Sequence, residues 1–118
     1  MTTNSKIYKG AIIRESLEEV SVLNDFKIVS TKVTDDIDPT ERWTIHDVEA
    51  DEATLLTLSK VLKPTKWYAH FWSDREVIAI FRDKVFRFNF DDKKSWEPAI
   101  AHGLSVGIPR EQLYFLIH

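Results

Sequence analysis

Four histidines are the residues of this sequence best suited to chemistry, because an imidazole can bind a metal or transfer a proton near neutral pH. They are His46, His70, His102 and His118. None stands at a ligand spacing such as H-x-x-x-H or H-E-x-x-H with another histidine or a carboxylate. His46 and Asp47 are adjacent, so in a strand their side chains point to opposite faces. The sequence therefore predicts no metal site and no cofactor.

Motifs for other catalytic chemistry are missing from the sequence. It contains no G-x-S-x-G nucleophile elbow. Its glycines, Gly10, Gly103 and Gly107, match neither the dinucleotide pattern G-x-G-x-x-G nor a phosphate-binding P-loop. The lack of cysteine excludes disulfides, thiolate metal sites and cysteine nucleophiles. Nucleotide-dependent and cysteine-dependent enzymes are therefore disfavoured.

One stretch, 84–90, interleaves basic and aromatic residues as an RNA-binding strand does. Its three phenylalanines, Phe86, Phe88 and Phe90, all fall on one face, which is typical of an ordinary half-buried strand. The 16 Lys and Arg against 19 Asp and Glu give a net charge of −3, whereas proteins that bind phosphates are usually basic. We expect no nucleic-acid partner.

A segment dense in aromatic residues supplies the best candidate site. If it is a strand, Trp67 and Phe71 share one face, where we expect them in the core. Tyr68, His70 and Trp72 share the other face, and each carries a polar group that needs a partner or water. We therefore expect these three side chains to line a ligand or partner site.

The elements that position these residues follow from hydrophobic patterning. Strands are predicted at 7–13, 27–34, 42–50, 66–72, 76–82 and 84–90, with the last three joined by short turns into an antiparallel meander. Helices are predicted at 16–24, at 52–62 and between Asp92 or Ser95 and Gly107, followed by an apolar end at 113–117 that docks on the body.

Caps and apolar spacing support these helices. Ser16 with Glu19 has the spacing of a capping box, and Leu17, Val20 and Leu23 form a stripe. In the second helix Asp51 is the cap, Pro64 ends the helix, and one face is formed by Leu55, Leu58 and Leu62.

This order of elements predicts an α+β class with a mostly antiparallel sheet and two or three helices. The start has the order of a ferredoxin-like (split βαβ) unit, extended by the meander and a C-terminal helix. We expect a single domain over 1–118, with residues 1–6 flexible. The 118 residues are 43% hydrophobic and 30% charged, close to the globular average, and no run is long enough to span a membrane. The polar start resembles no signal peptide, which favours the cytoplasm.

The central strands at 66–72 and 76–82 are apolar on both sides, so both faces of the sheet must be covered. Helices can cover one face. The chain ends, a second subunit or a ligand can cover the other, because soluble monomers rarely leave a large aromatic patch in water. This pattern predicts a homodimer through the sheet face, with plain core as the alternative.

Two blocks of the sequence resemble a known family. They are 63–72, which contains Trp-Tyr-Ala-His-Phe, and 103–115, which contains Gly-Ile-Pro-Arg-Glu-Gln-Leu. These blocks resemble a family of small prokaryotic proteins of about this length with WYAHF and GIPxEQLxF type segments. The resemblance covers most of the chain from Ile7 onward. It implies a stand-alone domain, and it brings no activity and no functional residues with it.

Two functions fit these observations. The favoured one is a non-enzymatic binding or interaction module that self-associates, or holds a small apolar or aromatic ligand, through the aromatic face. His46 would join this face if its strand paired with that of His70 in matching register. The alternative is a small enzyme in which His70 is a general acid or base, oriented by a strand carboxylate such as Asp47 or Glu49.

Overall fold

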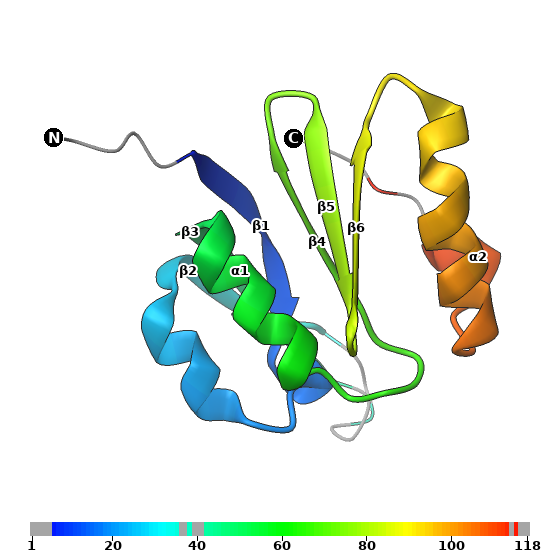
Figure 1. Ribbon diagram of the computed structural model, residues 1–118. Helices are drawn as coiled ribbons and strands as arrows, with labels where there is room; N and C mark the ends of the chain where they lie inside the picture. Colours follow the sequence, from blue (N-terminus) through cyan, green and yellow to red (C-terminus); the bar gives the residue numbers. More distant parts are fainter. Residues whose placement is uncertain (1–5, 36–37, 39–41, 114, 116–118) are drawn as a thin grey trace, which may run out of the picture.

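The centre of the molecule is a six-stranded antiparallel sheet with the strand order β2-β3-β1-β4-β5-β6 (Figure 1). The structure is a computed structural model, which describes residues 6–35, 38, 42–113 and 115. The strands are β1 (Ile7–Ile13), β2 (Lys27–Val33), β3 (Thr44–Asp51), β4 (Ala69–Ser73), β5 (Glu76–Phe81) and β6 (Lys84–Asn89). The α+β class, the six strands and the meander of β4, β5 and β6 are therefore confirmed.

The second and third predicted helices are present. Helix α1 (Glu52–Leu56) continues as a 3-10 helix (Thr57–Lys60), and helix α2 (Glu97–Ser105) follows a 3-10 turn (Lys93–Trp96). Asp51 caps α1 as predicted, since its Oδ1 accepts a hydrogen bond from the Thr54 backbone N–H at 2.9 Å. None of the helices in the described residues has the length and apolar character to cross a membrane.

The first predicted helix, at 16–24, is wrong. Two 3-10 helices, Arg14–Ser16 and Val20–Asp25, occupy this region instead. Leu17 lies between them in an extended conformation and forms an isolated β-bridge with Leu62, so a continuous helix cannot pass through it. Ser16 is no N-cap, because its Oγ donates to the Ile13 carbonyl at 2.5 Å.

The first face of the sheet is the face that α1 covers, and it carries the larger part of the core. Tyr8, Ile12 and Phe71 project from the sheet and are at most 2% exposed. The predicted helix face of Leu55, Leu58 and Leu62 packs onto them, and all three leucines are fully buried. Burial of this kind stabilises a protein by roughly 1.5–3 kcal/mol per large apolar side chain.

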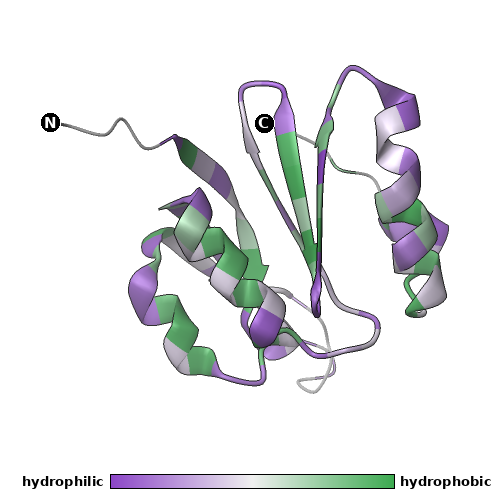
Figure 2. Ribbon diagram, viewed as in Figure 1, coloured by the Kyte–Doolittle hydropathy of each residue, from purple (hydrophilic) through white to green (hydrophobic). Residues whose placement is uncertain are grey.

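The second face is covered over β4, β5 and β6 by α2 and the segment that follows it, so α1 and α2 lie on opposite sides of the sheet (Figure 1). The ring of Phe88 lies 5.9 Å from that of Trp96 before α2 and 4.9 Å from that of Phe115 after it, and Phe81 and Leu113 belong to the same buried cluster. The described part of the apolar end therefore docks as predicted. Strand β5 contributes side chains to the cores on both faces, which explains why it is hydrophobic along most of its length (Figure 2).

The second face over β1, β3 and β2 is different. Within the described residues, no side chain that these strands direct to this face belongs to either core cluster. Ile7 of β1 is 50% exposed and Val29 of β2 is 58% exposed. The boundary between the covered and the uncovered half runs along β1 and β4, where the aromatic residues lie.

Candidate binding site

The three aromatic side chains expected to share a face form a row along the second face. The rings of Tyr68 and His70 lie 6.2 Å apart, and those of His70 and Trp72 lie 5.7 Å apart. Ala69 and Phe71 alternate with them and are buried on the first face. The predicted alternation is therefore present, since the two-residue period of a strand acts locally.

His46 does not join this row. It lies opposite Ile12 across the β1–β3 pair and is 6% exposed among first-face residues. Its Nδ1 lies 2.8 Å from Thr31 Oγ1, while Nε2 is buried without a hydrogen-bond partner among the described residues. Because β1 lies between β3 and β4, and because His46 points to the other face, it cannot line a site with His70.

Trp67 was expected in the core, and the structure shows that this is wrong. Strand β4 begins at Ala69, so Trp67 precedes the alternating segment. Lys66 has a φ of 68°, and this left-handed residue turns the chain immediately before Trp67. Trp67 is half-buried, and its indole meets that of Trp43 edge to face at 5.4 Å with an interplanar angle of 64°.

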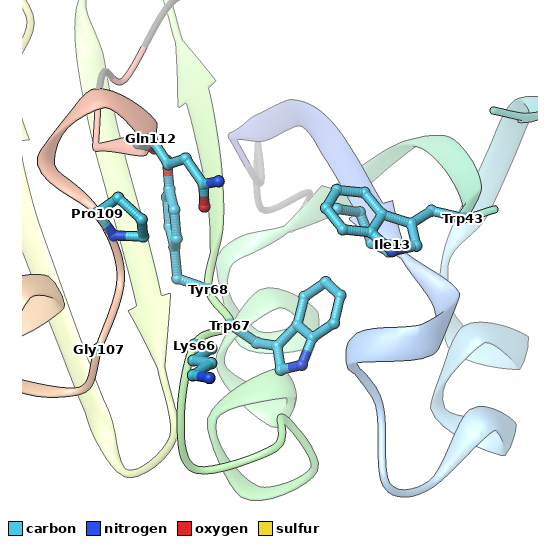
Figure 3. A pocket seen from close by; sticks show the side chains of 8 residues that line it. All are labelled: Ile13, Trp43, Lys66, Trp67, Tyr68, Gly107, Pro109 and Gln112. Carbon is cyan, nitrogen blue, oxygen red and sulfur yellow. The ribbon is translucent and has the colours of Figure 1, made fainter. Parts of the chain in front are cut away.

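The two tryptophans border a cavity of about 430 Å³ (Figure 3). It is lined by Ile13, Trp43, Lys66, Trp67, Tyr68, Gly107, Pro109 and Gln112. A second hollow of about 420 Å³ shares Ile13, Trp43, Tyr68 and Gln112 with it and continues over β1 and β3 to His70. We call the first hollow the aromatic cavity and the two together the aromatic groove.

One wall of the aromatic cavity comes from the chain after α2. Gly107, with a φ of 90°, ends the helix as predicted, and the Ile108 backbone N–H donates to the Gly103 carbonyl at 3.0 Å. Leu113 then packs directly on Gly103, where an added Cβ would lie 2.5 Å from its Cδ2. These contacts hold Gln112 beside the sheet, and the Gln112 carbonyl accepts a hydrogen bond from Tyr68 Oη at 2.5 Å.

The opposite wall is Trp43, just before β3. Its carbonyl accepts from the Thr34 backbone N–H at 2.9 Å, and its own N–H donates to Thr34 Oγ1 at 2.7 Å. The indole remains 37% exposed. Figure 3 shows Trp43 and Ile13 on one side, Tyr68 and Gln112 on the other, and Trp67 below. The side-chain amide of Gln112 points into the space between its own wall and Trp43 (Figure 3).

Sequence reasoning named Tyr68 and His70 for this face and missed Trp43, Trp67 and Gln112. A signal for the two tryptophans was present, because each follows a polar segment, and Trp43 lies one position before β3 and Trp67 two positions before β4. A side chain at such a position lies beyond the end of the strand, where the alternation of the strand does not fix its direction. Gln112 carried no signal of its own.

Trp72 lies farther along the second face, in a separate hollow of about 290 Å³. This hollow also contains Asp47 and Glu49, the carboxylates considered as orienting groups for His70. Asp47 accepts from Ser30 Oγ at 2.7 Å, and Glu49 lies 3.4 Å from Lys27 Nζ.

Both carboxylates share a face with His70, but β1 separates their strand from β4. Two strand spacings amount to roughly 10 Å, which is beyond hydrogen-bond distance. The ring contacts of His70 include those with Tyr68, Trp72 and Phe115.

The remaining histidines lie away from this row. His102, on α2, is half-buried with its ring 4.8 Å from that of Phe81. Burial lowers the pKa of His102, and the nearby charge of Lys84 lowers it further. His118 lies outside the described residues. In the described ranges no three His, Cys, Asp or Glu side chains gather as metal ligands.

Comparison of the chain with protein-family models, with curated proteins and with solved structures gave no match. The resemblance of the two sequence blocks to a prokaryotic family stays a prediction.

Proposed function

We propose that this protein is a non-enzymatic binding module whose site is the aromatic groove, and that its ligand is a small planar molecule. The observation that carries the proposal is the contact of Trp43 and Trp67 at the border of a cavity of about 430 Å³. Sites for small molecules have volumes of roughly 300–1,000 Å³, with mostly apolar and aromatic walls and a few polar groups.

The construction of the walls supports binding. Hydrogen bonds hold Tyr68 to Gln112 and Trp43 to Thr34, so both sides of the cavity are formed before a ligand arrives. A preformed site avoids the entropic cost of ordering its walls. The acid–base alternative has weaker support, because Asp47 and Glu49 contact Ser30 and Lys27 and lie across β1 from His70.

The proposal is tested with 2-naphthylmethanol, a neutral planar probe, added to ¹⁵N-labelled protein. The indole N–H signals of Trp43 and Trp67 are expected to shift. The signal of Trp96 is expected to stay, because its Nε1 donates to the Asn89 carbonyl at 3.2 Å and the ring is 8% exposed. Single Trp→Phe variants assign the signals.

Trp43→Ala is expected to weaken probe binding roughly three- to tenfold, the loss of one aromatic contact. Ile7→Ala, at another exposed apolar residue outside the groove, is the matched control and should leave affinity unchanged. If the probe shifts neither Trp43 nor Trp67, the groove is no binding site for planar molecules.

A second candidate is self-association through the uncovered half of the second face. The observation that favours it is the exposure of Ile7 (50%), Val29 (58%) and Trp43 (37%). The same half also carries three charged residues, Lys9, Asp47 and Glu49. A face with these charges can also remain in contact with water. Native mass spectrometry at micromolar concentration separates the two candidates, since a doubled mass supports a homodimer and a single mass argues against it.

We also infer that the first four strands form a ferredoxin-like start, extended by β5 and β6. The order β2-β3-β1-β4, with β1 antiparallel to both of its neighbours, supports this inference. The connection from β1 to β2 departs from that pattern because it is made of 3-10 helices. A cytoplasmic location stays a prediction.

A further inference from the structure

We propose that the ligand of the aromatic cavity is an aromatic anion, such as an aryl carboxylate, with Lys66 as its counter-charge. This inference rests on the proposed function, since it names the class of ligand for the same site. The inference follows from the charged and polar residues that line the cavity.

Aromatic walls alone do not select a ligand charge. Trp43, Trp67 and Tyr68 could stack on a planar ring or enclose an organic cation, because indole and phenol rings attract both. Sites for cations usually add a carboxylate. Among the described residues that line the aromatic groove there is no Asp and no Glu, whereas the aromatic cavity contains the lysine Lys66. The charge of the lining therefore favours an anion.

Lys66 is held at the cavity by its backbone. Its N–H donates to the Val106 carbonyl at 2.9 Å, which fixes the turn before Trp67 to the end of α2. Its stem passes over Gly107, where an added Cβ would lie 3.5 Å from Lys66 Cγ. Lys66 makes no ion pair within the described residues, so its ammonium group has no protein counter-charge there.

The conformation of Lys66 is unusual for its residue type. Three non-glycine residues have a positive φ in the described part of the chain, namely Lys66, Asp74 and Asp83. Asp tolerates the left-handed region because its short side chain can bond locally, whereas a lysine there is strained. Strained backbone is often found at binding sites, where the side chain is needed for function.

Gln112 supplies the second polar group. Its side-chain amide faces the cavity (Figure 3) and makes no hydrogen bond to the described residues. In Figure 3 Gln112 lies at the hydroxyl end of Tyr68 and Lys66 at the opposite end, beside Trp67. Lys66 thus provides the charge for the anionic group at one end of the cavity, and the Gln112 amide can form a hydrogen bond with the ligand at the other end.

The test compares three probes of one shape: 2-naphthoate, 2-naphthylmethanol and 2-naphthylmethylammonium. Binding is measured by the shifts of the Trp43 and Trp67 indole signals at low salt. The anion is expected to bind about fivefold more tightly than the neutral probe, which is the gain expected from a partly exposed ion pair. The cation is expected to bind more weakly than both. Added salt should reduce the preference for the anion.

Lys66→Asn is the decisive variant, because asparagine accepts a positive φ and removes the charge without adding strain. It should bind the anion and the neutral probe equally, while Lys66→Arg should keep the preference. Lys63→Asn, at an exposed lysine three positions earlier, is the control and should behave like the natural protein.

Each outcome decides between the two proposals. Equal binding of anion and neutral probe in the natural protein, with shifts of Trp43 and Trp67, would leave the proposed function standing and overturn the anionic ligand. Tightest binding of the cation would also overturn it. If Lys66→Asn kept the preference for the anion, Lys66 would serve only the end of α2. If no probe shifted Trp43 or Trp67, the proposed function itself would fail.

Discussion

Replacing Tyr8 by phenylalanine tests the electrostatics at one end of the sheet. Tyr8 is 2% exposed, and its hydroxyl donates a hydrogen bond to the Glu76 carboxylate. Glu76 also accepts from Lys6 Nζ at 2.9 Å. Burial, the hydrogen bond to Glu76 and the negative charge of Glu76 together raise the pKa of Tyr8 from 10.0 to about 12, with burial as the largest cause.

The sign of the pH effect follows from this raised pKa. The unfolded chain loses the phenolic proton near pH 10, whereas the folded protein keeps it until about pH 12. The stabilisation from the neutral phenol is therefore complete below pH 10 and is lost as the pH rises toward 12. A difference of two pKa units corresponds to about 2.7 kcal/mol in full, of which about 2 kcal/mol is lost between pH 9 and 11.5.

The assay is urea unfolding of the natural protein and of Tyr8→Phe, followed by tryptophan fluorescence between pH 7 and 11.5. At pH 9 the variant should be less stable by about 1.5–3 kcal/mol, because a hydrogen bond to a charged group is lost. The gap should close by about 2 kcal/mol at pH 11.5. The other two of the three tyrosines are present in both proteins, so their titration cancels. Parallel stability curves up to pH 11.5 would refute the reasoning.

Two further predictions concern the layer over the second face. Leu113→Ala should lower the free energy of unfolding by about 2–5 kcal/mol, because Leu113 is 4% exposed and packs on Gly103. It should also weaken probe binding, since Leu113 holds the wall that contains Gln112. Leu104→Ala is the control, because this side chain is 43% exposed, and a loss as large as that of Leu113→Ala would contradict the packing. His102 should titrate below its usual pKa of 6.5, because burial is the main cause of its lowered pKa. As the pH falls below 6.5 the unfolded chain takes up this proton first, so stability should decrease, and an NMR titration with a midpoint at or above 6.5 would exclude this effect.

Local features of the chain were predictable from the sequence. The six strands, the buried leucine face of α1 with its Asp51 cap, and the left-handed Gly107 after α2 all depend on residues a few positions apart. The row of Tyr68, His70 and Trp72 was predictable for the same reason, because the alternation of side chains along one strand does not depend on the neighbouring strands.

The first predicted helix was wrong for the opposite reason. Its apolar spacing was correct for a short helix, but the bridge between Leu17 and Leu62 holds the middle of the segment in an extended conformation. The partner lies 45 positions away along the chain, so a local pattern could not reveal it.

Only the tertiary structure decided which residues form the site. The sequence by itself determined that an aromatic face exists at β4, since side-chain direction within a strand is set by its backbone geometry. Strand order then placed β1 between β3 and β4 and separated His46 and both carboxylates from His70. The same order brought Trp43 to Trp67 at 5.4 Å and set Gln112 beside Tyr68. These contacts come from the folding of distant segments onto one sheet, a collective result of burying both its faces, and no spacing within the sequence encodes them.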